Sequence, residues 1–274
     1  MNKKAFIKTK GGADLDRIER SGQCFRWIYV SPGEYIIPAF GKAIHASEKD
    51  GGIEIEFLSK GSSEKDIPFW EKYFDAALDY GKIRRMPDSV DTFLTGAVKA
   101  GEGIRIIYQE PFETLITFII SQRKSIPAIK TSVERICDAV GRKIPGTDIN
   151  DFPAPEELYK LSDKEISECG LGYRAPYIHS AADAVFHGDI SFEALDKMSD
   201  DELIDALISL KGVGVKVANC TALFGFHRLD LFPIDVWIKR ALDRYYGGTF
   251  PLEKYHPYNG IMQQYIFAAR GNDL

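Results

Sequence analysis

Hydrophobic and polar residues alternate over short runs in the first part of the chain, which indicates β-strands. Three runs rich in β-branched and aromatic residues lie at 25–30, 34–37 and 53–58. The sequences Ser31-Pro-Gly33 and Asp50-Gly-Gly52 separate them, and such sequences are typical of hairpin turns. An antiparallel sheet is therefore predicted here.

From about Phe69 onward, hydrophobic residues recur every three or four positions, which is the helical period. Ser162 and Ser199 are each followed three positions later by glutamate, a pattern in which both side chains cap the first turn of a helix. Each serine is expected to begin a helix, and the segment Pro145–Pro155 is expected to connect two helical blocks. The predicted class is α+β, with an N-terminal antiparallel β-sheet domain (1–100) followed by two all-helical subdomains (101–274).

Composition then narrows the class of protein. With 274 residues, 45% of them hydrophobic and 27% charged, the chain is expected to be globular, which excludes disorder and collagen. Its longest apolar stretch, near 115–120, is far shorter than the roughly 20 residues of a membrane span. Four scattered cysteines and five dispersed histidines match no zinc or iron-sulfur spacing. A reduced cytoplasmic protein without a metal site is predicted.

Charge is distributed unevenly along the chain. The formal net charge of -5 argues against a nucleic-acid partner. Residues 120–145, however, hold six basic and two acidic residues, and residues 205–247 hold six basic and four acidic residues. The acidic excess lies elsewhere, so these two segments remain candidates for contact with a polyanion.

The most informative segment is a hairpin between two predicted helices at 199–226. It reads Lys211-Gly-Val-Gly-Val215, and two glycines around one small apolar residue predict a tight turn. Such a turn leaves the first N–H groups of the second helix unpaired, which creates an anion site suited to a phosphodiester. Taken alone, the same pattern is more often a packed helix corner.

Two potential catalytic groups follow from this hairpin. Lys216 lies at the start of the second helix, and Asp235 follows a proline where it can cap the next helix. Adjacent helix starts therefore present an amine and a carboxylate. Taken separately, a solvated lysine and a simple N-cap would explain both residues.

The hairpin with Lys216 and Asp235 resembles that of the helix-hairpin-helix DNA glycosylases. Four further motifs, in chain order, resemble the 8-oxoguanine DNA glycosylases of this superfamily: Ser21-Gly-Gln-Cys-Phe-Arg-Trp27, Gln109-Glu-Pro-Phe-Glu113, Gly170-Leu-Gly-Tyr-Arg-Ala175 and Gly260-Ile-Met-Gln-Gln-Tyr-Ile-Phe267. The second of these, together with Ser121, is similar to the start of that family's central helical domain. The resemblance spans most of the chain and implies an N-terminal domain similar to the TATA-binding-protein fold.

The resemblance implies a base-excising enzyme that flips 8-oxoguanine out of duplex DNA. The Gly22 carbonyl would accept from N7 of the lesion, and Gln263 would bond its Watson-Crick edge. The remaining residues of the implied base pocket are Cys220 and Phe267 on the two faces of the base, with Pro233 and Asp235 lining it. Taken alone, Cys220 and Phe267 would be core residues.

The resemblance also implies the chemistry. Lys216 would attack the sugar C1′, displace the base and form a Schiff base from which the 3′ phosphate is eliminated. Asp235 would stabilise positive charge on the sugar. The absence of clustered cysteines after the hairpin separates the chain from the iron-sulfur branches. No cofactor is expected, although the hairpin carbonyls are expected to suit a monovalent cation.

Contacts to duplex DNA are implied for a further set of residues. Tyr173 and Arg174 are expected to fill the vacated stack and to bond the opposite strand. The chain departs from the family at Arg123, where asparagine is frequent, and at Ala128, where a second arginine is frequent, and both departures weaken the expectation of a cytosine preference opposite the lesion. Trp237 replaces a histidine that contacts phosphate in some relatives, and Lys211, where proline is frequent, adds a charge beside the phosphate. The implied DNA-binding residues are Arg123, Tyr173, Arg174, Gly212, Val213, Gly214 and Val217.

Two alternatives remain open on the sequence. The hairpin also serves glycosylases for other damaged bases, and it occurs in non-catalytic modules that only hold the DNA backbone. Gly22 with Gln263 favours an oxidised purine, and Lys216 with Asp235 favours catalysis. The partner is expected to be double-stranded DNA containing oxidised guanine. A monomer in the cytoplasm, associated with the nucleoid in a prokaryote, is expected.

Overall fold

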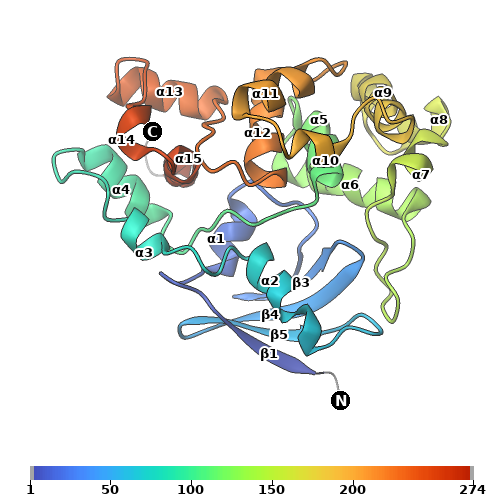
Figure 1. Ribbon diagram of the computed structural model, residues 1–274, viewed down its shortest axis with the longest axis horizontal. Helices are drawn as coiled ribbons and strands as arrows, with labels where there is room; N and C mark the ends of the chain where they lie inside the picture. The colour runs from blue at the N-terminus through green and yellow to red at the C-terminus, as the bar shows by residue number, and fades with distance from the viewer. Residues whose placement is uncertain (1–2, 272–274) are drawn as a thin grey trace.

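A single five-stranded antiparallel sheet forms the N-terminal part of the protein. The computed structural model describes residues 3–271, apart from the side chain of Asp163. The strand order is β1-β5-β4-β3-β2. In Figure 1 the sheet lies at the bottom of the view and most helices lie above it. The strands are β1 (Lys4–Lys8), β2 (Ile28–Ser31), β3 (Glu34–Ala39), β4 (Lys42–Lys49) and β5 (Gly52–Phe57).

Helices make up most of the remaining chain. Two of them, α1 and α2, contact the strands β3 and β1 respectively. Three short 3-10 helices lie at Glu64–Asp66, Gly172–Arg174 and Ala269–Gly271. The α-helices are α1 (Leu15–Arg20), α2 (Ile67–Tyr73), α3 (Tyr80–Ile83), α4 (Thr92–Ala100), α5 (Pro111–Ser121), α6 (Ile126–Val140), α7 (Pro155–Tyr159), α8 (Asp163–Glu168), α9 (Ala175–Phe186), α10 (Phe192–Leu195), α11 (Asp200–Ile208), α12 (Val215–Gly225), α13 (Val236–Tyr245), α14 (Leu252–Tyr255) and α15 (Asn259–Ala268).

The predicted α+β class with an N-terminal antiparallel sheet is confirmed. The sheet is larger than expected, because β1 and β4 were not predicted. The β4 sequence has alanines and charged residues that are neutral or poor strand formers, but the strand pairs on both sides, with β3 and with β5. The strand expected at 25–30 begins only at Ile28, since Phe25–Trp27 lead into it from the core.

The helix starts expected at Ser162 and Ser199 are confirmed. Ser162 caps α8 and Ser199 caps α11. In return, the side chain of Glu165 or Glu202 accepts a hydrogen bond from the N–H of the capping serine at 2.9 Å. The segment Pro145–Pro155 connects α6 to α7, as predicted. The proposed boundary between residues 100 and 101 stays a prediction.

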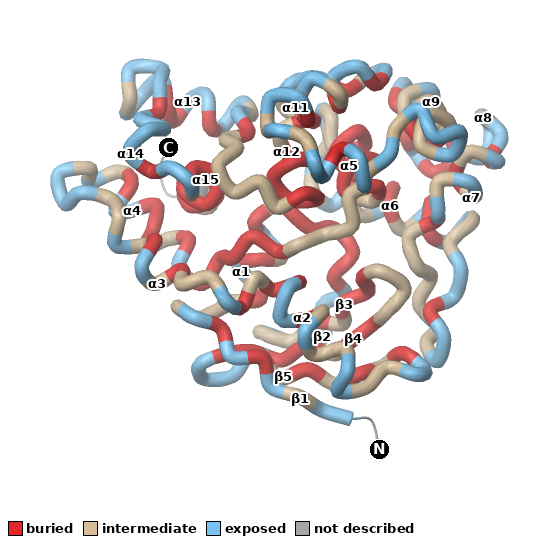
Figure 2. Tube along the Cα trace, viewed as in Figure 1, coloured by how far each residue is buried: buried red, intermediate tan, exposed pale blue. Residues whose placement is uncertain are grey.

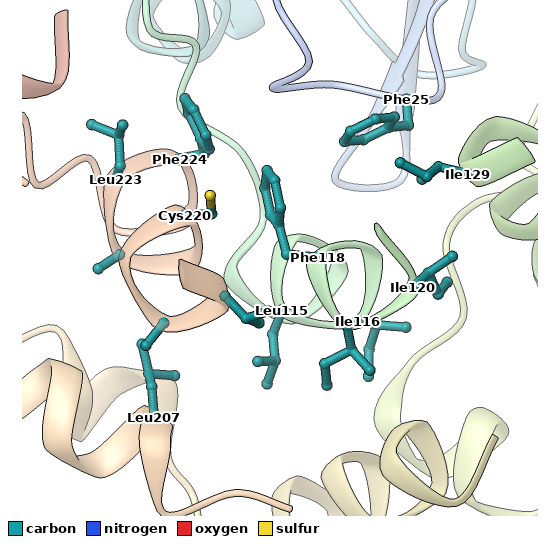
Figure 3. Close-up of a cluster of buried hydrophobic side chains, with 14 of the residues drawn as sticks. Phe25, Leu115, Ile116, Phe118, Ile120, Ile129, Leu207, Cys220, Leu223 and Phe224 are labelled. Atoms are coloured by element: carbon teal, nitrogen blue, oxygen red, sulfur yellow. The ribbon is translucent and has the colours of Figure 1, made fainter. Parts of the chain in front are cut away.

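The helical core is organised around the contact between α5 and α12. The Phe118 ring of α5 stacks on the Phe224 ring of α12, with centroids 5.5 Å apart and planes at 16°. Figure 3 shows Cys220 on the same side of α12, facing Phe118. Figure 2 shows that α5, α12 and α15 are largely buried, whereas the outer loops are exposed. The catalytic candidate on α12, Lys216, is therefore held by a rigidly packed helix.

One buried arginine joins the sheet domain to the helices. The Arg105 side chain is fully buried, and it donates to the backbone carbonyls of Phe74, Lys10, Gly12, Asp75 and Leu78. Every one of these acceptors is neutral, so the charge is solvated by carbonyl dipoles instead of by a carboxylate. Loss of such a group leaves several buried acceptors unpaired, which is strongly destabilising.

A second buried arginine has an excess of acidic neighbours. The Arg26 guanidinium lies 3.6 Å from Glu113 of α5, 3.5 Å from Glu134 of α6 and 3.7 Å from Asp151. Burial raises the pKa of Glu113 to about 7, although Arg26 acts in the opposite direction. Burial also raises the pKa of Glu134 and of Asp151.

The pH dependence of stability tests this cluster. Because the native pKa of Glu113 lies above its ordinary value, native Glu113 retains a proton that the unfolded chain releases, and stability falls as pH rises through 7. Glu113→Gln should therefore gain stability relative to the wild type between pH 5 and pH 8, by up to about 3 kcal/mol. Thermal melts across this range measure the difference. If the melting temperatures of Glu113→Gln and the wild type changed with pH in parallel, the assigned role of Glu113 would be wrong. Glu253→Gln, which alters an exposed glutamate, serves as the control.

Candidate active site

All the residues predicted to hold a base line one small cavity. Gly22, Cys220, Pro233, Asp235, Gln263 and Phe267 surround it together with Lys216. The cavity has a volume of about 50 Å³, and it opens into a larger cleft of about 570 Å³ that shares Gly22, Lys216, Asp235 and Phe267. Segments that lie up to 245 positions apart in sequence are thus brought to one point.

The hairpin has the predicted form. Helix α11 ends at Ile208 and α12 begins at Val215, with Gly214 as the N-cap and no side chain capping it. Gly212 has φ +81°, a conformation that glycine adopts without strain. The Val213 N–H donates to the Leu210 carbonyl at 3.1 Å. Val213 and Val217 have buried side chains, so any contact they make to DNA must come from their backbone.

Lys216 lies in the first turn of α12, at the mouth of the cavity. Its Nζ is 4.8 Å from the centre of the Phe118 ring. It also interacts with Cys220 one turn further on, where burial raises the pKa of the thiol and Lys216 opposes that shift. The amine is therefore partly enclosed by an aromatic face and a sulfur.

Asp235 is the N-cap of α13, as the sequence predicted. One carboxylate oxygen, Oδ1, accepts from the N–H of Trp237 at 2.9 Å and from that of Ile238 at 2.8 Å. No hydrogen bond to the other oxygen, Oδ2, is found within the described residues. The cap fixes the orientation of the carboxylate, while Asp235 also lines both the cavity and the cleft.

The loop that carries Gly22 is anchored in the core. Buried Gln23 donates to the Arg105 carbonyl at 2.9 Å and accepts from the Ile107 N–H at 2.9 Å. Gly22 has φ +76°, and a Cβ there would lie 3.2 Å from the Phe267 ring. A side chain at this position would therefore be strained and would also press on Phe267.

Several residues of the cavity were not predicted. Ser21, Phe118, Phe224 and Gln264 also line it, and Gln264 donates to the Gln263 side-chain oxygen at 2.9 Å. All four lie within or beside helices, where a hydrophobic or polar residue carries no separate sequence signal. Ser21 and Gln264 adjoin predicted residues and could have been found from that proximity.

Arg270 was also missed. Its guanidinium lies 3.9 Å from the centre of the Phe267 ring and donates to the Arg20 carbonyl at 3.0 Å. Burial lowers its pKa, and the nearby Asp235 carboxylate acts in the opposite direction. It therefore adds a cation behind the predicted base pocket.

Among the described residues that line the cleft, Arg123 is the one predicted DNA contact. Arg123 is exposed, has φ +52° and lines the cleft, whereas Tyr173 is 52% exposed. Arg174 is 6% exposed and donates to the carbonyls of Gln122 and Leu171. In this conformation Arg174 holds the loop and does not protrude toward a partner strand.

Gln122 connects these loops, a role that no sequence motif indicated. Its side-chain amide donates to the Gly212 carbonyl of the hairpin at 3.0 Å, while its own carbonyl accepts from Arg174. Lys124 in the same loop donates to the Gly170 carbonyl at 2.6 Å. The loop carrying Arg123 is thus tied to the hairpin and to the segment of Tyr173.

No metal site is evident from the side chains. Within residues 3–271, no group of three or more His, Cys, Asp or Glu residues is placed to hold a metal ion. The same part of the chain contains no helix long and apolar enough to cross a membrane.

Two family models cover most of the chain. Residues 5–115 match the N-terminal domain of 8-oxoguanine DNA glycosylase, and residues 116–254 match the HhH-GPD superfamily of base excision DNA repair proteins. The chain belongs to the 8-oxoguanine DNA glycosylase family. The resemblance predicted from four motifs is confirmed.

Relatives and solved structures agree with this family. The N-glycosylase/DNA lyase of Saccharomyces cerevisiae is 35% identical over 85% of this chain and 68% of its own length. The N-glycosylase/DNA lyase OGG1 of Arabidopsis thaliana is 32% identical over 82% of this chain and 64% of its own length. The chain spans about two thirds of these relatives. The predicted N-glycosylase/DNA lyase class is confirmed by these matches.

Two solved structures match almost the whole chain. MBOgg1 in complex with a low-affinity DNA ligand gives a TM-score of 0.90 at 34% identity, over 99% of this chain and 96% of that one. The Clostridium acetobutylicum 8-oxoguanine glycosylase/lyase, in complex with DNA containing cytosine opposite 8-oxoG, gives 0.87 at 32% identity over the full length of both.

The two hairpin glycines provide a matched stability test. A Cβ on Gly212 would lie 2.2 Å from the Tyr177 ring in a backbone conformation that disfavours side chains, whereas a Cβ on Gly214 would meet open space. Gly212→Ala should cost roughly 2–4 kcal/mol of stability. Gly214→Ala should leave the melting temperature nearly unchanged. Equal melting temperatures for the two variants would contradict this account of the hairpin.

Proposed function

We propose that this protein is a bifunctional DNA glycosylase that excises 8-oxoguanine from duplex DNA and cleaves the abasic site through a lysine Schiff base. The observation that carries the proposal is the single cavity that joins Lys216 and Asp235 to Gly22, Cys220, Gln263 and Phe267. Family membership supports the same reaction.

Base flipping follows from the position of the cavity. Its lining residues are mostly buried, so a base stacked in a duplex cannot reach Lys216 without leaving the helix. Flipping costs a few kcal/mol of stacking and pairing. In this proposal, the exposed side chains of Tyr173 and Arg123 would occupy the space that the base leaves.

Recognition of the lesion rests on one proton. 8-Oxoguanine carries a hydrogen on N7 that guanine lacks, and the Gly22 carbonyl is the proposed acceptor. Gln263 would bond the Watson-Crick edge, with Gln264 already holding its side-chain oxygen. The cavity of about 50 Å³ is too small for a purine, and the Phe267 ring lies against Gly22. Entry of the base therefore requires Phe267 to move. In its new position the Phe267 ring would stack on one face of the base, and Cys220 would contact the other face.

The chemical steps use Lys216 in its neutral form. The amine attacks C1′, the glycosidic bond breaks with its electron pair on the base, and the proton from the amine passes to the departing base. The C1′–O4′ bond of the resulting aminal then breaks, O4′ takes a proton, and the opened sugar is left as an imine of Lys216. The resulting imine makes the C2′ proton acidic, and its removal expels the 3′ phosphate. Asp235 Oδ2 would face the positive charge that develops on the sugar, while Oδ1 remains committed to the α13 cap.

The duplex itself would be held at helix starts. The uncapped first turn of α12 offers backbone N–H groups from Gly214 to Val217 to a phosphate. The Gly212 carbonyl accepts from Gln122 and the Leu210 carbonyl from Val213, so a monovalent cation would use the remaining hairpin carbonyls. The proposed setting is a cytoplasmic monomer acting on chromosomal DNA without a cofactor.

Borohydride trapping tests the nucleophile. Wild-type protein incubated with a duplex containing 8-oxoguanine should form a covalent adduct, and Lys216→Gln should lose it, by at least a hundredfold. Lys211→Gln, an exposed lysine of the same hairpin, should still be trapped. Undiminished trapping of the Lys216 variant would refute the assignment.

Opposite-base preference tests Arg123. Its side chain has no ion pair within the described residues, and its guanidinium can donate to acceptors on an orphaned base. Excision rates on duplexes with 8-oxoguanine opposite each of the four bases should become more uniform, or change order, in Arg123→Ala. Arg85→Ala, which alters an exposed arginine that does not line the cleft, is the control. An unchanged pattern across the four duplexes would count against the role.

A further inference from the structure

A second, larger cavity lies at the junction between the sheet domain and the helices. It has a volume of about 820 Å³, in the range of small-molecule sites. Its lining comes from Lys8 of β1 and Lys10 just beyond it, from the end of α2 and the residues that follow it, from Tyr108 and from His227, which lies two residues beyond α12. Helix α12 has 11 residues, so this cavity and Lys216 lie about 16 Å apart along it.

The frame of this cavity is rigid. Arg105 fixes the backbone on both sides, through the carbonyls of Lys10 and Asp75. The Asp75 carboxylate accepts from the Tyr80 hydroxyl at 2.8 Å and lies 3.4 Å from His227 Nε2. These bonds hold the walls in place without any ligand.

The cavity has an excess of free positive charge. Lys8, Lys10 and Lys72 line it, and none forms an ion pair with a carboxylate within the described residues. Of the two lining acids, Asp75 is already committed to Tyr80 and His227, which leaves Glu71 alone. In a protein of net charge -5, three unpaired amines in one cavity favour an anionic ligand.

An aromatic surface accompanies this charge. The Lys72 Nζ lies 4.0 Å from the centre of the Tyr108 ring, and the ring itself is only partly buried. Ala76 and Ala77 give the remaining wall an apolar, flat character. A planar ligand group can take the place of the Lys72 ammonium on that ring, and the ammonium is then free to bind an anion.

We propose that this cavity is a binding site for a nucleoside phosphate, with the base against Tyr108 and the phosphate between Lys8, Lys10 and Lys72. A base or a phosphate alone would use only half of these contacts. Because the site lies at the opposite end of α12 from Lys216, it is separate from the cleft and can be occupied while DNA is bound.

Calorimetric titration tests the proposal with three probes: deoxyguanosine monophosphate, deoxyguanosine and inorganic phosphate. The monophosphate should bind at least tenfold more tightly than either fragment. The double variant Lys8→Gln/Lys72→Gln should weaken its binding at least tenfold, and Tyr108→Ala should weaken the monophosphate but not inorganic phosphate. Circular dichroism melts check that each variant is folded.

Two control variants separate this site from other sites. Lys216→Gln should leave binding of the monophosphate unchanged, since the cleft is not involved, and the exposed Lys82→Gln should do the same. Loss of binding in Lys216→Gln, or equal affinity for the monophosphate and inorganic phosphate, would overturn the proposal. Base excision by Lys8→Gln/Lys72→Gln should stay at the wild-type rate. Failure of the nucleoside phosphate site is therefore distinguishable from failure of the proposed glycosylase function.

Discussion

The packing of α5 against α12 is the constraint on which the rest of the site depends. Phe118 and Phe224 stack across the contact, and Gly225 of α12 approaches the start of α5 so closely that a Cβ would lie 3.0 Å from the Pro111 Cα. Burial of each aromatic ring contributes a few kcal/mol. The contact therefore fixes both the distance and the rotation of the two helices, and with them the direction in which Lys216 points.

This packing brings functional groups together at one end of the helix pair. At this end, Lys216 opens α12 while α5 ends at the loop of Gln122 and Arg123. The Gln122 amide bonds the hairpin carbonyl of Gly212, so the loop and the hairpin cannot move independently. A change in α5 is thus transmitted to the loop and to the hairpin together, since a hydrogen bond joins them and the helix core does not yield.

The sequence predicted the local features of the site well. Ser199 and Asp235 act through bonds to residues within four positions, so their spacing alone carries the information. The bond of Gln122 to Gly212 and the bonds of Arg105 could not be predicted, because these acceptors lie between 27 and 95 positions away. The role of Arg174 was mispredicted in part for the same reason. A motif predicted that Arg174 contacts DNA, whereas in the structure its guanidinium donates to the carbonyl of Gln122, 52 positions away. Strands β1 and β4 were missed because neighbouring strands, and not their own residues, stabilise them.

Hydrogen bonds connect the residue proposed to recognise the base with the junction between the sheet and the helices. Gln23, next to Gly22, donates to the backbone carbonyl of Arg105, the same residue whose side chain binds five carbonyls around the junction. The proposed acceptor for the lesion is therefore next to a residue that is hydrogen-bonded to the backbone of Arg105. An acceptor that must distinguish one proton needs a fixed position, because a hydrogen bond weakens steeply with distance and angle. This requirement gives a physical reason for a fully buried charge at the junction, where a hydrophobic residue would pack as well but would not orient the chain.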